Sequence, residues 1–280
     1  MKLDIRATLI ATALAFIAAS PVAAVCTTQV VTEADVVRQP ENTPPTSNWV
    51  LNSRLASSTG TFVSGPEQPP AGGGSLELRT PTSADKVALF NYEHIGTLLA
   101  SVDAIGYSTY RDAASTATPN QVHSINVQID YNGSAPGGFS NLVFEPVYNT
   151  AQGAIVPGEW QTWDAYNGGQ AIWWSTRAIP GVCAFDCFVT WETIVANNPD
   201  AVIAGGFGVN QGSGNGGLFA ATDALTLGYN GTCVRYDFEA FRVATTKDQC
   251  KDGGWQAVRR ADGSAFRNQG DCIQYVNTGK

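Results

Sequence analysis

Charged side chains are scarce in this sequence of 280 residues, at 14%, and histidine occurs only twice. The sequence has no HExxH pattern, nucleophile elbow or phosphate-binding Lys-Ser/Thr pair. It therefore lacks the usual signatures of zinc peptidases, α/β-hydrolases and P-loop proteins. His94 and His123 stand far from every cysteine, so we expect no transition-metal centre. The sequence therefore predicts no cofactor, and leaves open a structural calcium ion held by loop Asp and Asn oxygens.

A long hydrophobic run is also missing after residue 24, where no 18 consecutive residues are apolar. A bilayer of about 30 Å needs a helix of about 20 such residues, so we expect no membrane insertion of the mature chain. The 16 basic residues are outnumbered by 24 acidic ones, and the isoelectric point is near 4.7. Nucleic acids and anionic membranes attract basic surfaces, so neither is an expected partner.

The first 24 residues have the features of a secretory signal. Lys2 and Arg6 precede or flank the start of an apolar stretch at residues 7–19, and small residues end the segment at 20–24. The stretch is too short to span a bilayer, which favours cleavage after about Ala24 and a secreted, extracellular protein over a retained anchor. Lipid attachment at Cys26 is disfavoured because the preceding Val25 is larger than the small residue this modification needs.

Glycine and proline are abundant, with 29 and 14 residues, and they separate short apolar runs. Turn signals such as Gly72-Gly73-Gly74 and Asn230-Gly231 lie between runs of alternating apolar and polar residues. This pattern predicts an all-β fold, a two-sheet antiparallel jelly-roll sandwich. The predicted strands are residues 49–55, 60–63, 75–79, 86–92, 102–111, 124–131, 141–148, 159–163, 171–176, 201–209, 224–229 and 233–238.

The main β domain is expected at residues 48–243. The preceding segment, 25–47, is polar and contains Pro44-Pro45, which indicates an extended lead-in without a core of its own. Residues 244–280 differ in composition and predict a small C-terminal appendage. A unit of this size buries little apolar surface, so a disulfide is the expected staple.

One short helix interrupts the strands. Thr190 can cap the segment 191–196, and Asn197-Asn198-Pro199 cannot continue it. The sequence therefore predicts a helix of under two turns just before the strand at 201–209.

Six cysteines remain after the predicted cleavage site. An even number in an exported protein favours disulfides over zinc or catalytic thiols, although six cysteines allow 15 pairings. The sequence does not choose among these pairings, and our expectation is pairs that close short loops or tie the mature N-terminus to the last strand of the main domain. The predicted pairs are Cys26 with Cys233, Cys183 with Cys187, and Cys250 with Cys272.

Several segments carry a resemblance to a known group of folds. They are residues 74–78, 108–111, 142–146, 205–208 and 223–228, and together they resemble secreted bacterial domains of the broad concanavalin-like, laminin-G-like jelly-roll group. The tail, from Cys250-Lys-Asp-Gly-Gly-Trp255 to Cys272, is similar to a short C-terminal motif of many exported bacterial proteins, to which no activity is assigned. The group includes lectins, glycoside hydrolases, polysaccharide lyases and adhesion domains, so the resemblance implies a fold and carries over no catalytic residue.

Aromatic and amide side chains are the main candidates for ligand binding. A flat ring covers the apolar face of a sugar, and nearby amides and carboxylates bond its hydroxyl groups. Trp173 and Trp174 are adjacent in a predicted strand, so they face opposite sides and one of them is free of the core. The predicted ligand-binding residues are Tyr110, Arg111, Asn126, Gln128, Asp130, Glu145, Trp173 and Trp174.

Carboxylates leave an enzymatic alternative open. Glu145 shares a strand face with valines, so it needs a partner such as Arg111 or a substrate hydroxyl. A glycosidase needs two carboxylates about 5–9.5 Å apart, for which Glu145 with Asp130 is one candidate pair and Asp237 with Glu239 another. A lyase needs a Tyr or His base, and the available residues are His94, His123, Tyr107 and Tyr110.

These observations predict a secreted, lectin-like protein that binds a polysaccharide or other glycan without a cofactor. A glycoside hydrolase or polysaccharide lyase that uses the same groove is the first alternative, and an adhesion or structural surface module is the second.

Overall fold

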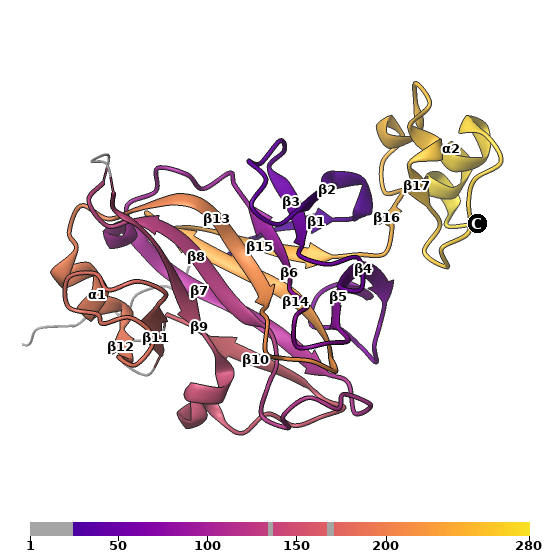
Figure 1. Ribbon diagram of the computed structural model, residues 1–280. Helices are drawn as coiled ribbons and strands as arrows, with labels where there is room; N and C mark the ends of the chain where they lie inside the picture. The colour runs from indigo at the N-terminus through magenta and orange to yellow at the C-terminus, as the bar shows by residue number, and fades with distance from the viewer. Residues whose placement is uncertain (1–24, 134–136, 167–170) are drawn as a thin grey trace, which may run out of the picture.

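Two large β-sheets pack face to face in the computed structural model of the protein (Figure 1). The structure describes residues 25–133, 137–166 and 171–280, so the predicted secretory signal lies outside the described residues. The all-β sandwich with a small disulfide-linked C-terminal appendage is confirmed. Both sheets are mixed, because a parallel strand lies at one edge of each. No helix in the described segments is long and apolar enough to cross a membrane.

The seven-stranded sheet is built around the long strand β14 (Leu218–Tyr229). One edge of β14 pairs with β7 (Val102–Arg111), and the other pairs with β5 (Gly74–Thr80) and then with β15 (Thr232–Phe238). The remaining strands are β1 (Thr27–Val31) beside β15, β4 (Thr59–Ser64) beside β5, and β10 (Trp160–Asp164) beside β7.

The eight-stranded sheet has the order β12-β11-β9-β8-β13-β6-β3-β2. Its strands are β12 (Val189–Thr190), β11 (Ile172–Ser175), β9 (Phe139–Phe144), β8 (Ser124–Asp130), β13 (Val202–Gln211), β6 (Val87–Asn91), β3 (Trp49–Ser53) and β2 (Val36–Pro40). Short 3-10 turns occur at Glu33–Asp35, Leu99–Ser101, Pro146–Tyr148, Thr150–Gln152, Asp248–Cys250 and Gly254–Gln256.

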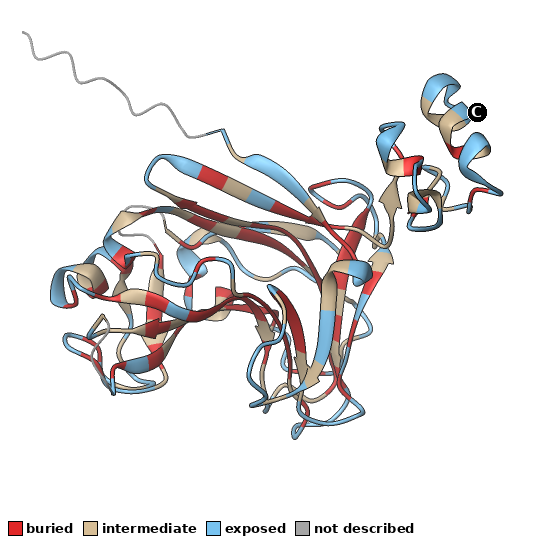
Figure 2. Ribbon diagram, turned by 90° about the horizontal axis from the view of Figure 1, so that it is seen from above, coloured by how far each residue is buried: buried red, intermediate tan, exposed pale blue. Residues whose placement is uncertain are grey.

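Alternation along each strand decides what faces the core. On β8, Ile125, Val127 and Ile129 are almost completely buried between the sheets, whereas Asn126 and Gln128 are half-buried on the outer face. This is the separation of faces that the period of two in a strand produces. Figure 2 shows the resulting buried stretches along the strands of both sheets.

Local turn and cap signals behave as their chemistry predicts. Asn230 and Gly231 join β14 to β15 with φ of 53° and 72°, the left-handed pair that a two-residue hairpin turn needs. Helix α1 (Trp191–Asn197) begins after Thr190, whose side chain accepts a hydrogen bond from the backbone N–H of Thr193 at 3.2 Å. The predicted helix is therefore confirmed.

The segment before residue 48 differs from its prediction. Strand β1 pairs in parallel with β15, and β2 pairs in parallel with β3, so each sheet receives one strand from this segment. Val31 is buried in the main core. The segment is thus part of the sandwich and not an extended lead-in, because its partners lie far along the chain where local composition gives no sign of them.

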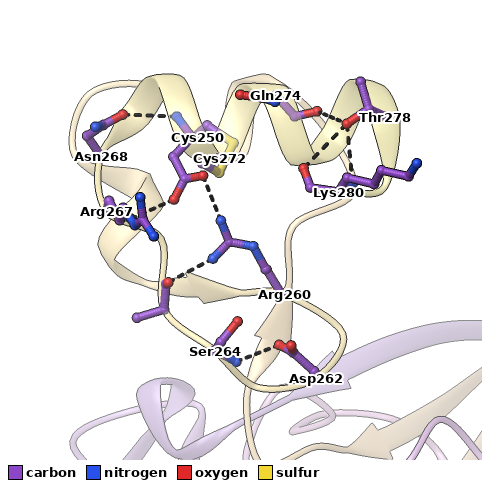
Figure 3. A network of polar contacts seen from close by, with 12 residues as sticks. Cys250, Arg260, Asp262, Ser264, Arg267, Asn268, Cys272, Gln274, Thr278 and Lys280 are labelled. Atoms are coloured by element: carbon purple, nitrogen blue, oxygen red, sulfur yellow. Dashed lines mark hydrogen bonds and ion pairs between the residues drawn. A yellow bond between two sulfur atoms is a disulfide. The ribbon is translucent and has the colours of Figure 1, made fainter.

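The C-terminal appendage folds around a small core of its own, set apart from the sandwich (Figures 1 and 2). Its strand β17 (Val258–Arg259) pairs with β16 (Arg242–Val243), which leads into the appendage, and helix α2 (Gln269–Thr278) follows. Arg260 pairs with Asp271 at 2.6 Å, and the Asn268 side chain caps α2 by accepting from the backbone N–H of Asp271 (Figure 3). Its core residues are Ala244, Cys250, Val258, Phe266 and Cys272.

All three predicted disulfides are present: Cys26–Cys233, Cys183–Cys187 and Cys250–Cys272. The first ties the start of β1 to β15, the second closes a loop after β11, and the third joins α2 to the rest of the appendage (Figure 3). Cross-links of this kind matter most in the appendage, since a unit of about 35 residues cannot bury enough apolar surface to be stable alone.

Candidate functional site

A groove of about 810 Å³ lies over the outer face of the eight-stranded sheet. Six strands in succession contribute to its lining, from β3 through β6, β13, β8 and β9 to β11. Four of the predicted ligand-binding residues line it together: Asn126, Gln128, Glu145 and Trp174. The groove is therefore the candidate functional site.

Glycines in β13 let side chains of the neighbouring strands pack against its backbone in the middle of the groove. A Cβ atom on Gly206 would lie 2.6 Å from Cβ of Phe90, and one on Gly205 would overlap the amide oxygen of Gln128. The backbone N–H of Gly206 donates to Oε1 of Gln128 at 2.7 Å, at an irregular point of the β13–β8 pairing. Because β13 carries no side chain at these two positions, Gln128 and Phe90 lie against its backbone and form this part of the lining.

Amides line the adjacent strands. Gln128 on β8 lies directly opposite Asn141 on β9, and Asn126 lies one step further along the same face. Oδ1 of Asn126 accepts from the Ser124 hydroxyl at 3.0 Å, whereas the side chain of Asn141 makes no hydrogen bond to any described residue. Asn141 therefore offers a donor and an acceptor to a bound ligand.

Glu145 and Trp174 meet at the β9–β11 end of the groove. The indole N–H of Trp174 donates to Oε2 of Glu145 at 2.9 Å. Burial raises the pKa of Glu145, and this hydrogen bond lowers it by less. The sequence correctly indicated a half-buried carboxylate that needs a partner, but the partner is an indole and not Arg111.

The opposite end of the groove contains a group of paired charges. Oε2 of Glu41 accepts from Arg54 and Oε1 accepts from Lys86, each at 2.6 Å. The hydrogen bond from Arg54 is the main cause that lowers the pKa of Glu41. Arg54 and Lys86 are the two cations among the described lining residues, and Glu41 neutralises part of their charge.

Four of the predicted ligand-binding residues lie outside the groove: Trp173, Tyr110, Arg111 and Asp130. Trp173 is fully buried and packs on Phe144 at 5.6 Å, so Trp174 is the member of the pair that faces outward. Tyr110 and Arg111 belong to β7 in the other sheet. Tyr110 contacts Trp160 there, at 5.7 Å between ring centroids. None of the four lines the groove.

Arg111 is buried and organises the loop that follows β7. Its guanidinium donates to the backbone oxygens of Gln121 at 3.2 Å and Ala117 at 2.9 Å, with longer bonds to Asp112 and Ser115. Burial is the main cause that lowers its pKa. Arg111 therefore acts on the groove only through this loop, which places Gln121 in the lining.

Asp130 does not approach Glu145. Strands β8 and β9 are antiparallel, with Ile125 opposite Phe144 and Asp130 opposite Phe139. The two carboxylates consequently lie at opposite ends of this strand pair, roughly 20 Å apart by strand geometry. Oδ1 of Asp130 instead accepts from the backbone N–H of Asn132 in the turn. The proposed pair with Glu145 is wrong.

The side chains considered for a lyase are also outside the groove. His94 is buried and lies 2.7 Å from the hydroxyl of Tyr236 through Nε2. His123 is fully buried, and burial lowers its pKa to about 3. The hydroxyl of Tyr107 donates to the backbone oxygen of His123 inside the core. These residues serve packing and internal hydrogen bonding.

Asp237, in β15, and Glu239, just after it, do lie together against the loop at Gly72. Glu239 accepts from the backbone N–H of Gly73 at 2.6 Å. Burial, followed by the charge of Glu239, raises the pKa of Asp237 to about 6. Neither residue lines the groove. Within the described segments, no group of three or more His, Cys, Asp or Glu side chains has the geometry of a metal site.

The buried Asp237 predicts a specific pH dependence of stability. Its pKa is higher in the folded than in the unfolded chain, so it favours folding below about pH 4 and that contribution is lost as the pH rises through about 6. We expect Asp237→Asn to raise the free energy of unfolding at pH 8 by about 1–2 kcal/mol and to flatten its pH dependence. Thermal unfolding between pH 4 and pH 8 measures this.

Burial raises the pKa of Asp223 to about 7, so this residue also makes the free energy of unfolding fall as the pH rises. We therefore expect the Asp237→Asn variant to retain part of this pH dependence. The exposed Asp186→Asn is the control and is expected to follow the native protein. If the free energy of unfolding of Asp237→Asn depends on pH as it does in the native protein, the pKa of this carboxyl does not differ between the folded and unfolded chains.

Two parts of the groove were not predicted. Phe185, at the tip of the Cys183–Cys187 loop, lines the end beside Trp174, and Glu41 with Pro44 closes the other end. The close spacing of the two cysteines was a signal for a tight exposed loop, but nothing local indicated which strand end the loop would contact. The position of Glu41 depends on the parallel pairing of β2 with β3.

Comparisons of this chain with protein-family models, with curated proteins and with solved structures gave no match.

Proposed function

We propose that the protein binds a glycan chain non-covalently in the groove of the eight-stranded sheet. The observation that carries the proposal is the convergence of amides, a carboxylate and an indole on one open surface: Asn126, Gln128, Asn141, Glu145 and Trp174. Sugars combine apolar ring faces with many hydroxyl groups, and sites that bind them need a flat apolar contact beside a few placed polar groups.

The dimensions of the groove support a chain ligand over a single sugar. Six strands, from β3 to β11, contribute lining residues, and a spacing of about 4.8 Å between strands gives a length of roughly 24 Å. A groove of this length accommodates several linked sugar units. We infer a polysaccharide or a long oligosaccharide as the ligand.

Export fits this ligand class. Three disulfides suit an oxidising compartment outside the cytoplasm. The proposal extends this to a secreted protein of the concanavalin-like, laminin-G-like group, supported by the two-sheet architecture and by the signal-like first 24 residues.

A hydrolase in the same groove has less support. Its described lining contains two carboxylates, Glu145 and Glu41, which lie toward opposite edges of the eight-stranded sheet. Glu41 is also held by two cations. Glycosidases need their two carboxyl groups about 5–9.5 Å apart, across one glycosidic bond. This geometry therefore favours binding without cleavage.

The test is incubation of purified residues 25–280 with soluble and insoluble polysaccharides, scoring retention and the release of reducing or unsaturated ends. Retention without product is the expected result. Product that disappears in Glu145→Gln would establish an enzyme in place of a lectin. The absence of both retention and product across a broad panel would overturn the carbohydrate proposal and favour an adhesion or structural module.

A further inference from the structure

A disulfide-closed loop presents an exposed phenylalanine at the edge of the groove. Phe185 lies at the tip of the loop between Cys183 and Cys187 and is 59% exposed. Its φ is 63°, in the left-handed region that bulky side chains rarely adopt. An exposed aromatic ring in this backbone conformation gains nothing from burial in the core, and its face is available to a ligand.

The loop is held in place by more than its disulfide. The backbone N–H of Phe185 donates to the oxygen of Ser175 at 2.9 Å, and Ala184 forms an isolated parallel bridge with the same residue. Ser175 is the last residue of β11, directly after Trp174. These contacts place the Phe185 ring beside the Trp174 ring, with 5.6 Å between centroids and 36° between planes.

The surroundings of the two rings are polar and contain no cation from the groove lining. Glu145 accepts from Trp174, and the amide of Asn141 and the hydroxyl of Thr176 line the same end. The two lining cations, Arg54 and Lys86, are at the other end and paired with Glu41. Arg177, the nearest cation along the chain, is not in the lining, and its guanidinium lies over the Phe139 ring, 5.4 Å from the ring centroid. A uronic acid or sulfated sugar on the two rings would therefore lie next to the carboxylate of Glu145, which bonds Trp174 directly, while the charge of Arg177 is engaged with Phe139.

We propose that Phe185 and Trp174 form a stacking subsite for an uncharged sugar ring, which makes the ligand of the groove a neutral polysaccharide. This inference rests on the proposed glycan-binding function and assigns its ligand class. The disulfide and the backbone contacts of the loop hold Phe185 before the ligand arrives, so little conformational freedom is lost on stacking. Asn141 and Glu145 lie where they can bond hydroxyl groups at the edge of the stacked ring.

Affinity electrophoresis of the full mature chain tests this, with xylan, mixed-linkage β-glucan and hydroxyethyl cellulose as neutral probes and alginate and polygalacturonate as anionic ones. We expect retardation by at least one neutral probe and none by the anionic probes. Phe185→Ala is expected to weaken binding of the neutral probe about 10-fold, and Phe185→Tyr to preserve it. Phe188→Ala is the matched control.

Phe188 suits this purpose because it is an exposed phenylalanine three residues away that packs on Tyr148 outside the groove. Its replacement is expected to leave the affinity unchanged. The double variant Cys183→Ser/Cys187→Ser is expected to weaken neutral-probe binding several-fold with little change in Tm, since a disulfide across so short a loop removes little chain entropy.

The outcomes separate the two proposals. If the native protein binds a neutral probe and Phe185→Ala binds it equally well, the subsite is wrong and glycan binding stands. If the native protein prefers the anionic probes, the neutral ligand class is wrong and glycan binding again stands. If no probe is retarded, both proposals are overturned, and the exposed ring is left as a contact for a protein partner.

Discussion

Trp174→Ala is expected to lower the affinity for the neutral polysaccharide about 30-fold or more, equivalent to about 2 kcal/mol. The substitution removes the largest ring face in the groove. It also removes the N–H that donates to Glu145, so a half-buried carboxylate loses its hydrogen bond. Isothermal titration with the best probe from the binding panel measures the change.

Trp160→Ala is the matched control for this prediction. Trp160 is also half-buried and also donates its indole N–H to an oxygen atom, the backbone carbonyl of Pro66, but it lies in the seven-stranded sheet. We expect its replacement to leave the affinity unchanged. Trp174→Phe is expected to fall between the native protein and Trp174→Ala, because it keeps a ring face and loses the hydrogen bond. Equal affinities of the native protein and Trp174→Ala would remove the main support for the groove as the glycan-binding site.

Arg111→Ala is expected to cost about 3 kcal/mol of folding free energy and to lower Tm by roughly 6–12 °C. Its guanidinium reaches the backbone oxygens of Gln121 and Ala117, which would be left without these bonds. Arg111→Lys is expected to recover little of this loss, because an ammonium cannot reproduce the planar set of donors. Thermal and urea unfolding provide the measurement.

The exposed Arg235→Ala serves as the control for Arg111→Ala and is expected to change the free energy of unfolding by less than about 0.5 kcal/mol. The same experiment tests the assignment of Arg111 as a ligand-binding residue from the sequence. A variant that keeps its Tm and loses glycan binding would support that assignment and contradict the structural role derived from its buried contacts.

Much of the fold could be predicted from patterns of residues close together in the sequence. Thr190 and Pro199 bracket α1, and Asn230-Gly231 marks the hairpin between β14 and β15, because caps and turns depend on side chains a few residues apart. The three disulfide pairs were also correct. Strand β1 was missed, since its stability comes from parallel pairing with β15 about 207 residues away.

The candidate site was predicted in part for the same reason. Asn126 and Gln128 were placed on an outer strand face by alternation alone, and Trp174 was separated from Trp173 by the same rule. Tyr110 was also predicted as an aromatic residue on a strand, but that strand lies in the opposite sheet. Alternation describes the two faces of one strand and carries no information about which sheet the strand joins.

The amino-acid sequence by itself therefore determined that this chain forms short strands with one apolar face, that its six cysteines form disulfides, and which polar residues face outward. Only the tertiary structure decided that β9 and β11 bring Glu145 to Trp174, that antiparallel pairing sends Asp130 to the far end, and that Phe185 joins the groove. The physical reason is that a side chain's direction follows from local backbone geometry, whereas its neighbours follow from strand order and register, which long-range packing selects.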